Sequence, residues 1–99
     1  MTSKHYSNDR KQREENIKKI GYGVKVNCFV IDRGHKNGAE IHEITSTGII
    51  NIYNQRTGKL VTKLIARPNQ IKRYYKEGKA PQELLNKAYE NTVINHYNN

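Results

Sequence analysis

The stretch from Leu60 to Tyr75, LVTKLIARPNQIKRYY, constrains the fold most, because a strand pattern runs directly into a helix pattern. Residues 60–66 mix β-branched and aliphatic side chains, a composition typical of a buried strand. Pro68 has no backbone N–H and fits the first turn of a helix, so it ends the strand and opens the helix. Gly78 suits the left-handed conformation that stops a helix. We therefore expect Arg67 to lie at a strand-to-helix corner.

The same part of the chain is strongly basic. Residues 44–76 contain no Asp or Glu but seven Lys and Arg, and the whole chain has a net charge of +9 at pH 7. A cluster of cations that no carboxylate interrupts is the electrostatic footprint of a nucleic-acid-binding surface. The predicted nucleic-acid contacts are Arg56, Lys59, Gln70, Lys72, Arg73, Tyr74 and Lys76. The alternative interpretation is a basic surface that is merely solvated.

Three segments upstream of this stretch have strand composition, and they cover residues 24–31, 39–45 and 49–54. The connections between neighbouring strands are too short for parallel crossovers, so the four strands should form an antiparallel meander. A helix from Ser7 or Asn8 to about Ile20 precedes the strands, and Pro81 opens a second helix after the corner helix. The predicted fold class is α+β: an N-terminal helix, a four-stranded antiparallel sheet and two C-terminal helices.

The length of 99 residues fits one small domain with one modest core. We expect residues 1–6 to be disordered and residues 24–77 to form a basic core of sheet and helix. Cys28 has no second cysteine with which to pair, so we interpret it as a core residue in a reducing cytosol. No apolar stretch approaches the roughly 18 residues of a membrane span, which predicts a cytoplasmic protein with no membrane partner.

Alternation along the predicted strands assigns side chains to faces. In the first strand, the apolar face should carry Val24, Val26, Cys28 and Val30. A turn of Arg56, Thr57 and Gly58 places Asn51 opposite Lys63 and Tyr53 opposite Val61, with Asn51, Tyr53 and Lys63 on a polar face. The core face should then carry Ile50, Ile52, Leu60, Thr62, Leu64 and Ala66.

The face on which His42 lies depends on the turn that follows it. A two-residue turn at Thr47 and Gly48 puts His42 beside Tyr53 on the polar face, whereas a three-residue turn points it into the core. We favour the two-residue turn. An unremarkable surface or hydrogen-bonded histidine is the alternative to a catalytic one.

The residue types indicate neither a metal site nor a bound cofactor, because the histidines lack ligand spacing and no phosphate-binding glycine motif is present. RNA cleavage needs only a base, an acid and cations that stabilise the phosphorane. His42 could act as base or acid, and Lys63 and Arg67 could stabilise the phosphate. Tyr53 or Tyr74 could stack on a base or relay a proton.

The motifs EIH (residues 40–42), GIINIYN (48–54) and LIARPNQIKRYY (64–75) resemble small metal-independent ribonucleases of the barnase, EndoU, colicin D and RelE superfamily, which includes toxin and phage-borne members. The resemblance implies a catalytic site on the open face of the sheet, formed here by His42, Tyr53, Lys63 and Arg67. It also implies an acidic antidote or immunity protein as a partner. RelE-type chains begin with a strand followed by helices, and this chain departs from that order.

The leading hypothesis is therefore a metal-independent endoribonuclease, toxin-like or phage-encoded, that cleaves cytoplasmic tRNA or mRNA through attack of the 2′-hydroxyl. The alternative is a basic nucleic-acid-binding protein without catalysis. A third class is a protein-interaction module with an acidic partner. Convergence of His42, Tyr53, Lys63 and Arg67 on one open face would favour the enzyme.

Overall fold

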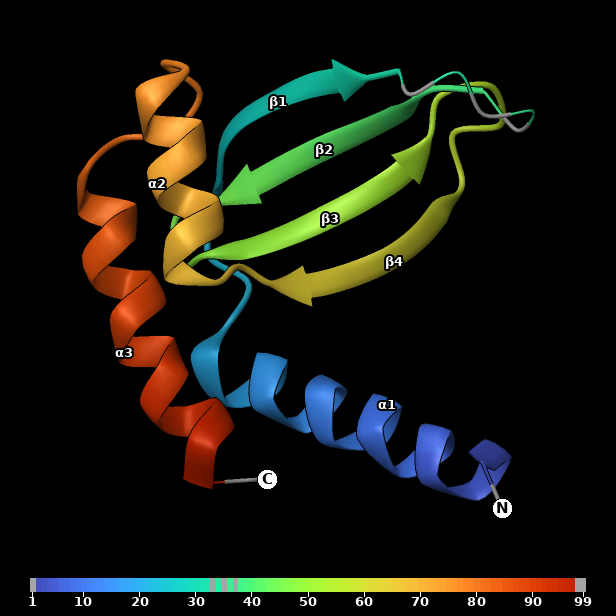
Figure 1. Ribbon diagram of the computed structural model, residues 1–99, viewed down its shortest axis with the longest axis vertical. Helices are drawn as coiled ribbons and strands as arrows, with labels where there is room; N and C mark the ends of the chain where they lie inside the picture. Colours follow the sequence, from blue (N-terminus) through green and yellow to red (C-terminus); the bar gives the residue numbers. More distant parts are fainter. Residues whose placement is uncertain (1, 33, 35, 37, 98–99) are drawn as a thin grey trace.

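The computed structural model describes residues 2–97 except 33, 35 and 37, with side chains described between Lys11 and Ile94 (Figure 1). The elements are helix α1 (Thr2–Ile20), strands β1 (Lys25–Ile31), β2 (Glu40–Thr45), β3 (Ile49–Asn54) and β4 (Leu60–Ile65), and helices α2 (Pro68–Lys76) and α3 (Glu83–Tyr97). This order confirms the predicted α+β fold class. The helix α1 begins at Thr2, earlier than the predicted start at Ser7 or Asn8.

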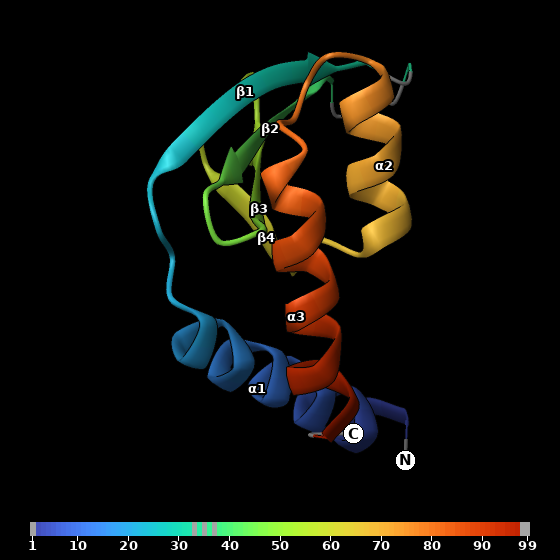
Figure 2. The same ribbon diagram turned by 90° about the vertical axis from the view of Figure 1, so that its left-hand side faces the viewer.

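The four strands form one sheet in the order β1-β2-β3-β4, and every neighbouring pair is antiparallel. The predicted meander is confirmed, and β1 and β4 are its two edges. The helices α2 and α3 lie together on one side of the sheet (Figure 2). We call this side the covered face and the other side the open face. The helix α1 contacts β4 and α3 at one end of the molecule.

The main core lies between the covered face and the two C-terminal helices. Its buried residues are Ile44, Ile50, Ile52, Ala66, Ile71, Tyr74, Ala80, Leu84 and Ala88, with Phe29, Leu64 and Leu85 packed against them. The predicted core positions Ile50, Ile52, Leu64 and Ala66 are confirmed. Residues Ile71 and Tyr74 are one helical turn apart, so both point from α2 to the sheet.

The predicted apolar face of the first strand is wrong, because the opposite set of β1 side chains points to the helices. Phe29 lies opposite His42 on β2, and its ring meets that of Tyr74 edge to face, with centroids 5.2 Å apart. One aromatic ring buries more apolar surface than a valine, which favours this orientation. Cys28 and Val30 consequently lie on the open face and are exposed, so Cys28 is not a core residue.

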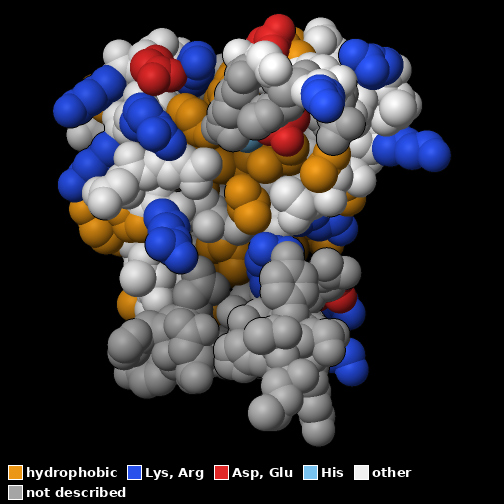
Figure 3. Space-filling model, turned by 45° about the vertical axis from the view of Figure 1, so that its right-hand side comes forward, with side chains coloured by type: hydrophobic (Ala, Val, Ile, Leu, Met, Phe, Trp, Pro, Cys, Tyr) orange, Lys and Arg blue, Asp and Glu red, His pale blue; other side chains and the backbone are white. Residues whose placement is uncertain are grey.

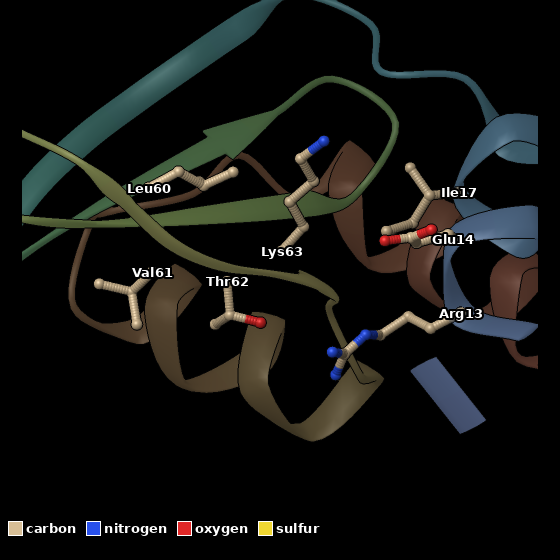
Figure 4. A pocket seen from close by; sticks show the side chains of 7 residues that line it. All are labelled: Arg13, Glu14, Ile17, Leu60, Val61, Thr62 and Lys63. Carbon is tan, nitrogen blue, oxygen red and sulfur yellow. The ribbon is translucent and has the colours of Figure 1, made fainter. Parts of the chain in front are cut away.

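The predicted pair of Asn51 with Lys63 is confirmed, but the pair of Tyr53 with Val61 is wrong. A bulge interrupts the register after Ile52, so that Tyr53 lies opposite Leu60. Figure 4 shows Leu60 and Lys63 pointing to one side of β4 and Thr62 to the other. Leu60 therefore leaves the core and keeps 44% of its surface exposed. A bulge adds one unpaired residue and reverses the alternation beyond it.

Candidate nucleic-acid interface

The turn between β2 and β3 decides where His42 lies. Ile44 pairs with Ile50, and the chain reverses through a turn around residues 46–48. Gly48 adopts φ +89° and donates its N–H to the carbonyl of Thr45 at 3.1 Å. This is the longer of the two turns weighed from the sequence. The prediction of a two-residue turn is therefore wrong, and His42 lies opposite Ile52 on the covered face.

His42 is consequently a core side chain, only 3% exposed. Its ring stacks on Phe29 with centroids 6.0 Å apart, and its Nε2 lies 3.2 Å from Oε1 of Glu40. The other ring nitrogen, Nδ1, is buried and has no hydrogen-bond partner among the described residues. The imidazole is therefore not accessible to a phosphate group that binds at the surface of the protein.

Tyr53 and Lys63 lie on the open face, on the opposite side of the sheet from His42. The Lys63 Nζ donates a hydrogen bond to Oη of Tyr22 at 3.0 Å and lies 4.9 Å from the centroid of that ring. This hydrogen bond is the main reason why the pKa of Lys63 is raised above its ordinary value. The lysine is therefore charged at neutral pH and held in place. Tyr22, which precedes β1, was not among the predicted site residues.

Arg67 lies at the strand-to-helix corner, as predicted, where it is the N-cap residue of α2 with extended backbone. Its side chain is exposed and makes no capping hydrogen bond. The four predicted catalytic residues are thus distributed over three places: the core, the open face and the corner. The structure does not bring His42 together with Tyr53 and Lys63.

The predicted binding residues on α2 divide into an exposed group and a buried one. Lys72, Arg73 and Lys76 are exposed along the helix. Tyr74 is only 4% exposed, and its hydroxyl accepts a hydrogen bond from Nε2 of Gln70 at 3.1 Å. Its ring is therefore not accessible for stacking on a base, because it fills the core against Phe29.

Two exposed tyrosines that were not among the predicted binding residues lie on the same helices as these cations or beside them. Tyr75 follows the buried Tyr74 and points away from the core, and the Tyr89 ring on α3 lies 5.8 Å from the Lys72 Nζ. The exposure of Tyr75 could have been predicted from helical spacing, because consecutive helix residues point about 100° apart and Tyr74 points to the core. The position of Tyr89 beside Lys72 depends on how α2 packs on α3, which the sequence does not indicate.

Arg56 and Lys59 lie in the turn between β3 and β4, and both are exposed. Figure 3 shows Lys and Arg side chains on two sides of an area of apolar side chains. Among the described residues, ion pairs join Lys79 to Glu77 at 3.0 Å and Lys87 to Glu90 at 3.6 Å. Both pairs lie outside residues 44–76. None of the seven cations of that segment is paired with a described carboxylate.

A cleft of about 570 Å³ lies between α1 and β4 (Figure 4). Arg13, Glu14 and Ile17 line it from α1, and residues 60–63 line it from β4. Arg13 thus adds a cation beside the edge strand that carries Lys63. Sequence reasoning missed Arg13 because the approach of α1 to β4 is a long-range contact. Within the described part of the chain, no helix is long and apolar enough to cross a membrane, and no three His, Cys, Asp or Glu residues form a metal-binding group.

Searches of protein-family models, curated proteins and solved structures found no match to this chain. What the structure establishes is the fold, a small α+β protein with a four-stranded meander. The ribonuclease resemblance stays a prediction based on short motifs.

Proposed function

We propose that the protein binds RNA without cleaving it, and that residues 44–76, here called the basic segment, form the interface. The observation that carries the proposal is that seven cations of this segment have no described carboxylate partner. These cations are Arg56, Lys59, Lys63, Arg67, Lys72, Arg73 and Lys76. A cation that has no ion pair to break is available to a phosphate, and each phosphate it neutralises releases bound counterions.

Exposed aromatic rings beside these cations favour RNA with unpaired bases. Tyr75 is 49% exposed on α2, next to Lys76, and the Tyr89 ring lies close to Lys72. Single-stranded nucleic acids are bound by cations that follow the backbone and by aromatic rings that stack on successive bases. The outer surface of α2 and α3 offers both kinds of group within reach of one strand.

The geometry supports binding better than cleavage by the predicted residues. General acid-base catalysis requires the proton-transferring group within hydrogen-bonding reach of the reacting hydroxyl. His42 is buried on the covered face, whereas Lys63 lies on the open face of the same sheet. No single phosphate can contact both side chains while the sheet is intact.

The proposal is tested by the salt dependence of binding to a fluorescent single-stranded RNA, measured by anisotropy. If three phosphates are neutralised, raising the salt from about 50 to about 200 mM should weaken binding at least about tenfold. The triple variant Lys72→Gln/Arg73→Gln/Lys76→Gln should bind more weakly and show a shallower salt slope. The control is Lys87→Gln, which removes an exposed α3 lysine that pairs with Glu90. Wild-type binding that is absent at low salt, or insensitive to salt, would contradict the proposal.

A second arm separates binding from cleavage. The wild-type protein should leave structured and unstructured RNAs intact after prolonged incubation, with or without EDTA. Products that end in 2′,3′-cyclic phosphate, and that disappear with His42→Ala, would restore the ribonuclease hypothesis, because the 2′-hydroxyl is the nucleophile in that reaction.

A further inference from the structure

The edge strand β1 has an outer side on which Figures 1 and 2 show no described helix or strand. Sheet edges in monomeric proteins are usually protected by charges, proline, bulges or a covering element. The other edge has such protection, because β4 carries Lys63 and a bulge and contacts α1. In β1 the bulge lies at the start, and the six residues 26–31, VNCFVI, contain neither a charge nor a proline.

The exposed side chains of β1 form an apolar row. Val26 is 41% exposed and Val30 is 51% exposed, and Cys28 between them is also exposed. Neutral, β-branched strand residues of this kind favour pairing with a further strand. The chain has a net charge of +9, but residues 26–31 carry none of it. The outer edge of β1 is therefore available for pairing with a further strand.

The charges at the two ends of β1 indicate which strand could pair with its outer edge. Cys28 is the central residue of Lys25–Ile31, with Lys25 at one end and Asp32 just beyond the other. Antiparallel pairing of two identical strands about Cys28 puts Val26 opposite Val30 of the second copy. In the same register Lys25 of each copy lies opposite Ile31 of the other, and Asp32 lies one position further along, opposite Val24. The two opposite charges are therefore neighbours along the pair of strands, and both residues are exposed. Opposite charges on neighbouring strands stabilise a pair.

We infer that β1 is a self-association surface, and that the partner is β1 of a second copy of this chain. The two sheets then join into one continuous sheet about a two-fold axis perpendicular to it, with self-complementary contacts on both sides of the axis. This arrangement places α2 and α3 of both copies on the same side. Four of the seven cations of the basic segment lie on β4 or in the connections at its two ends, at the opposite edge of the sheet from β1. The other three lie on α2, which contacts β1 through Tyr74 and Phe29.

An interface made mainly by one strand is small compared with stable dimers, so the dimer should dissociate over the micromolar range. Sedimentation velocity across protein concentrations measures this equilibrium. The double variant Val26→Lys/Val30→Lys places like charges opposite one another and should be monomeric at every concentration. The double variant Val26→Glu/Val30→Glu should also be monomeric, and an equimolar mixture of the two should dimerise again.

The matched control is Val61→Lys, which adds a lysine at an exposed position of the other edge strand and should leave dimerisation unchanged. Circular dichroism checks that all the variants are folded. A wild-type protein that is monomeric at high concentration overturns the inference. A dimer that survives Val26→Lys/Val30→Lys, or a mixture of the opposite variants that stays monomeric, overturns it as well.

Cysteine cross-linking provides a second test, which uses the free Cys28 of the wild-type protein. Directly opposed residues in an antiparallel pair have Cα atoms about 4.5–5.5 Å apart, which is within the range that a disulfide spans. Mild oxidation of wild-type protein should therefore link the two Cys28 residues rapidly, and Val26→Lys/Val30→Lys should prevent this. Cross-linking that is equally slow in both proteins contradicts the proposed register.

Discussion

The imidazole of His42 stacks on the ring of Phe29 at a centroid distance of 6.0 Å, on the face of the sheet that α2 and α3 cover. Phe29 in turn meets Tyr74 of α2, so the histidine belongs to an aromatic group that joins β1, β2 and α2. Within the part of the chain that the structure describes, the buried Nδ1 has no hydrogen-bond partner, and Nε2 lies 3.2 Å from Oε1 of Glu40. The role that this geometry supports is packing.

Replacing His42 should therefore affect stability and leave RNA binding unchanged. We expect His42→Ala to lower the free energy of unfolding by about 1–3 kcal/mol, because it leaves a cavity beside Phe29. His42→Leu keeps most of the volume and removes the unpaired Nδ1, so it should cost clearly less. Urea denaturation measures both variants. Equal destabilisation by the two substitutions would show that the contact with Glu40, and not volume, is the stabilising feature.

The position of His42 shows what the sequence could and could not predict. The strands, their order and most of the core of β3 and β4 follow from alternation and from Pro68, because these signals are local. Which side chains of β2 face the core depended on whether the turn before β3 has two or three residues. A shift of one residue moves every side chain of a strand to the other face. The bulge that displaced Leu60 has no clear local signature, since pairing between strands creates it.

The turn at Gly48 can be tested by adding a single methyl group. Gly48 and Gly58 both have positive φ, so alanine strains the backbone at either position. A Cβ at Gly48 would also lie 3.0 Å from Nδ2 of Asn91, whereas a Cβ at Gly58 meets open space. That Nδ2 donates to the carbonyl of Thr47 at 2.8 Å and fixes the turn to α3.

Gly48→Ala should consequently destabilise the protein more than Gly58→Ala, for which we expect about 1–2 kcal/mol from the backbone alone. Thermal denaturation compares the two variants directly. Equal losses would mean that Asn91 moves aside and that the contact with Thr47 contributes little.

The hydrogen bond between Lys63 and Tyr22 predicts a measurable change in a pKa. This bond is the largest cause that raises the pKa of Lys63, and burial opposes it. Tyr22→Phe should therefore lower the pKa of Lys63, as followed by NMR of the lysine side chain. Tyr53→Phe is the control, because Tyr53 contributes less than Tyr22 to the raised pKa of Lys63.

The sign of the effect on stability follows from linkage. A lysine whose pKa is higher in the folded state stabilises the protein while it is protonated, below the pKa of the unfolded state. The stability difference between wild type and Tyr22→Phe should therefore be fully present at neutral pH. It should disappear as the pH rises through the pKa of Lys63 in the folded protein. A difference that grows with alkaline pH would contradict this assignment.

The corner residue Arg67 offers the clearest separation of binding from folding. Its backbone carbonyl accepts the N–H groups of Gln70 and Ile71 at 3.0 and 3.1 Å, and alanine keeps both hydrogen bonds. Its side chain is exposed and makes no capping contact. We therefore expect Arg67→Ala to change the free energy of unfolding by less than about 0.5 kcal/mol.

The same substitution should weaken RNA binding by a similar factor for RNAs of different sequence, because a phosphate contact carries no base information. If Arg67 neutralises one phosphate, the slope of log affinity against log salt should fall by about 0.7 for a single strand. Arg67→Lys keeps the charge and should keep most of that slope, which separates a charge effect from the loss of guanidinium geometry. If Arg67→Ala loses helical signal together with RNA binding, the corner residue is needed to hold α2 in place. Arg73→Ala, on the exposed side of the same helix, would then be the variant that measures a phosphate contact.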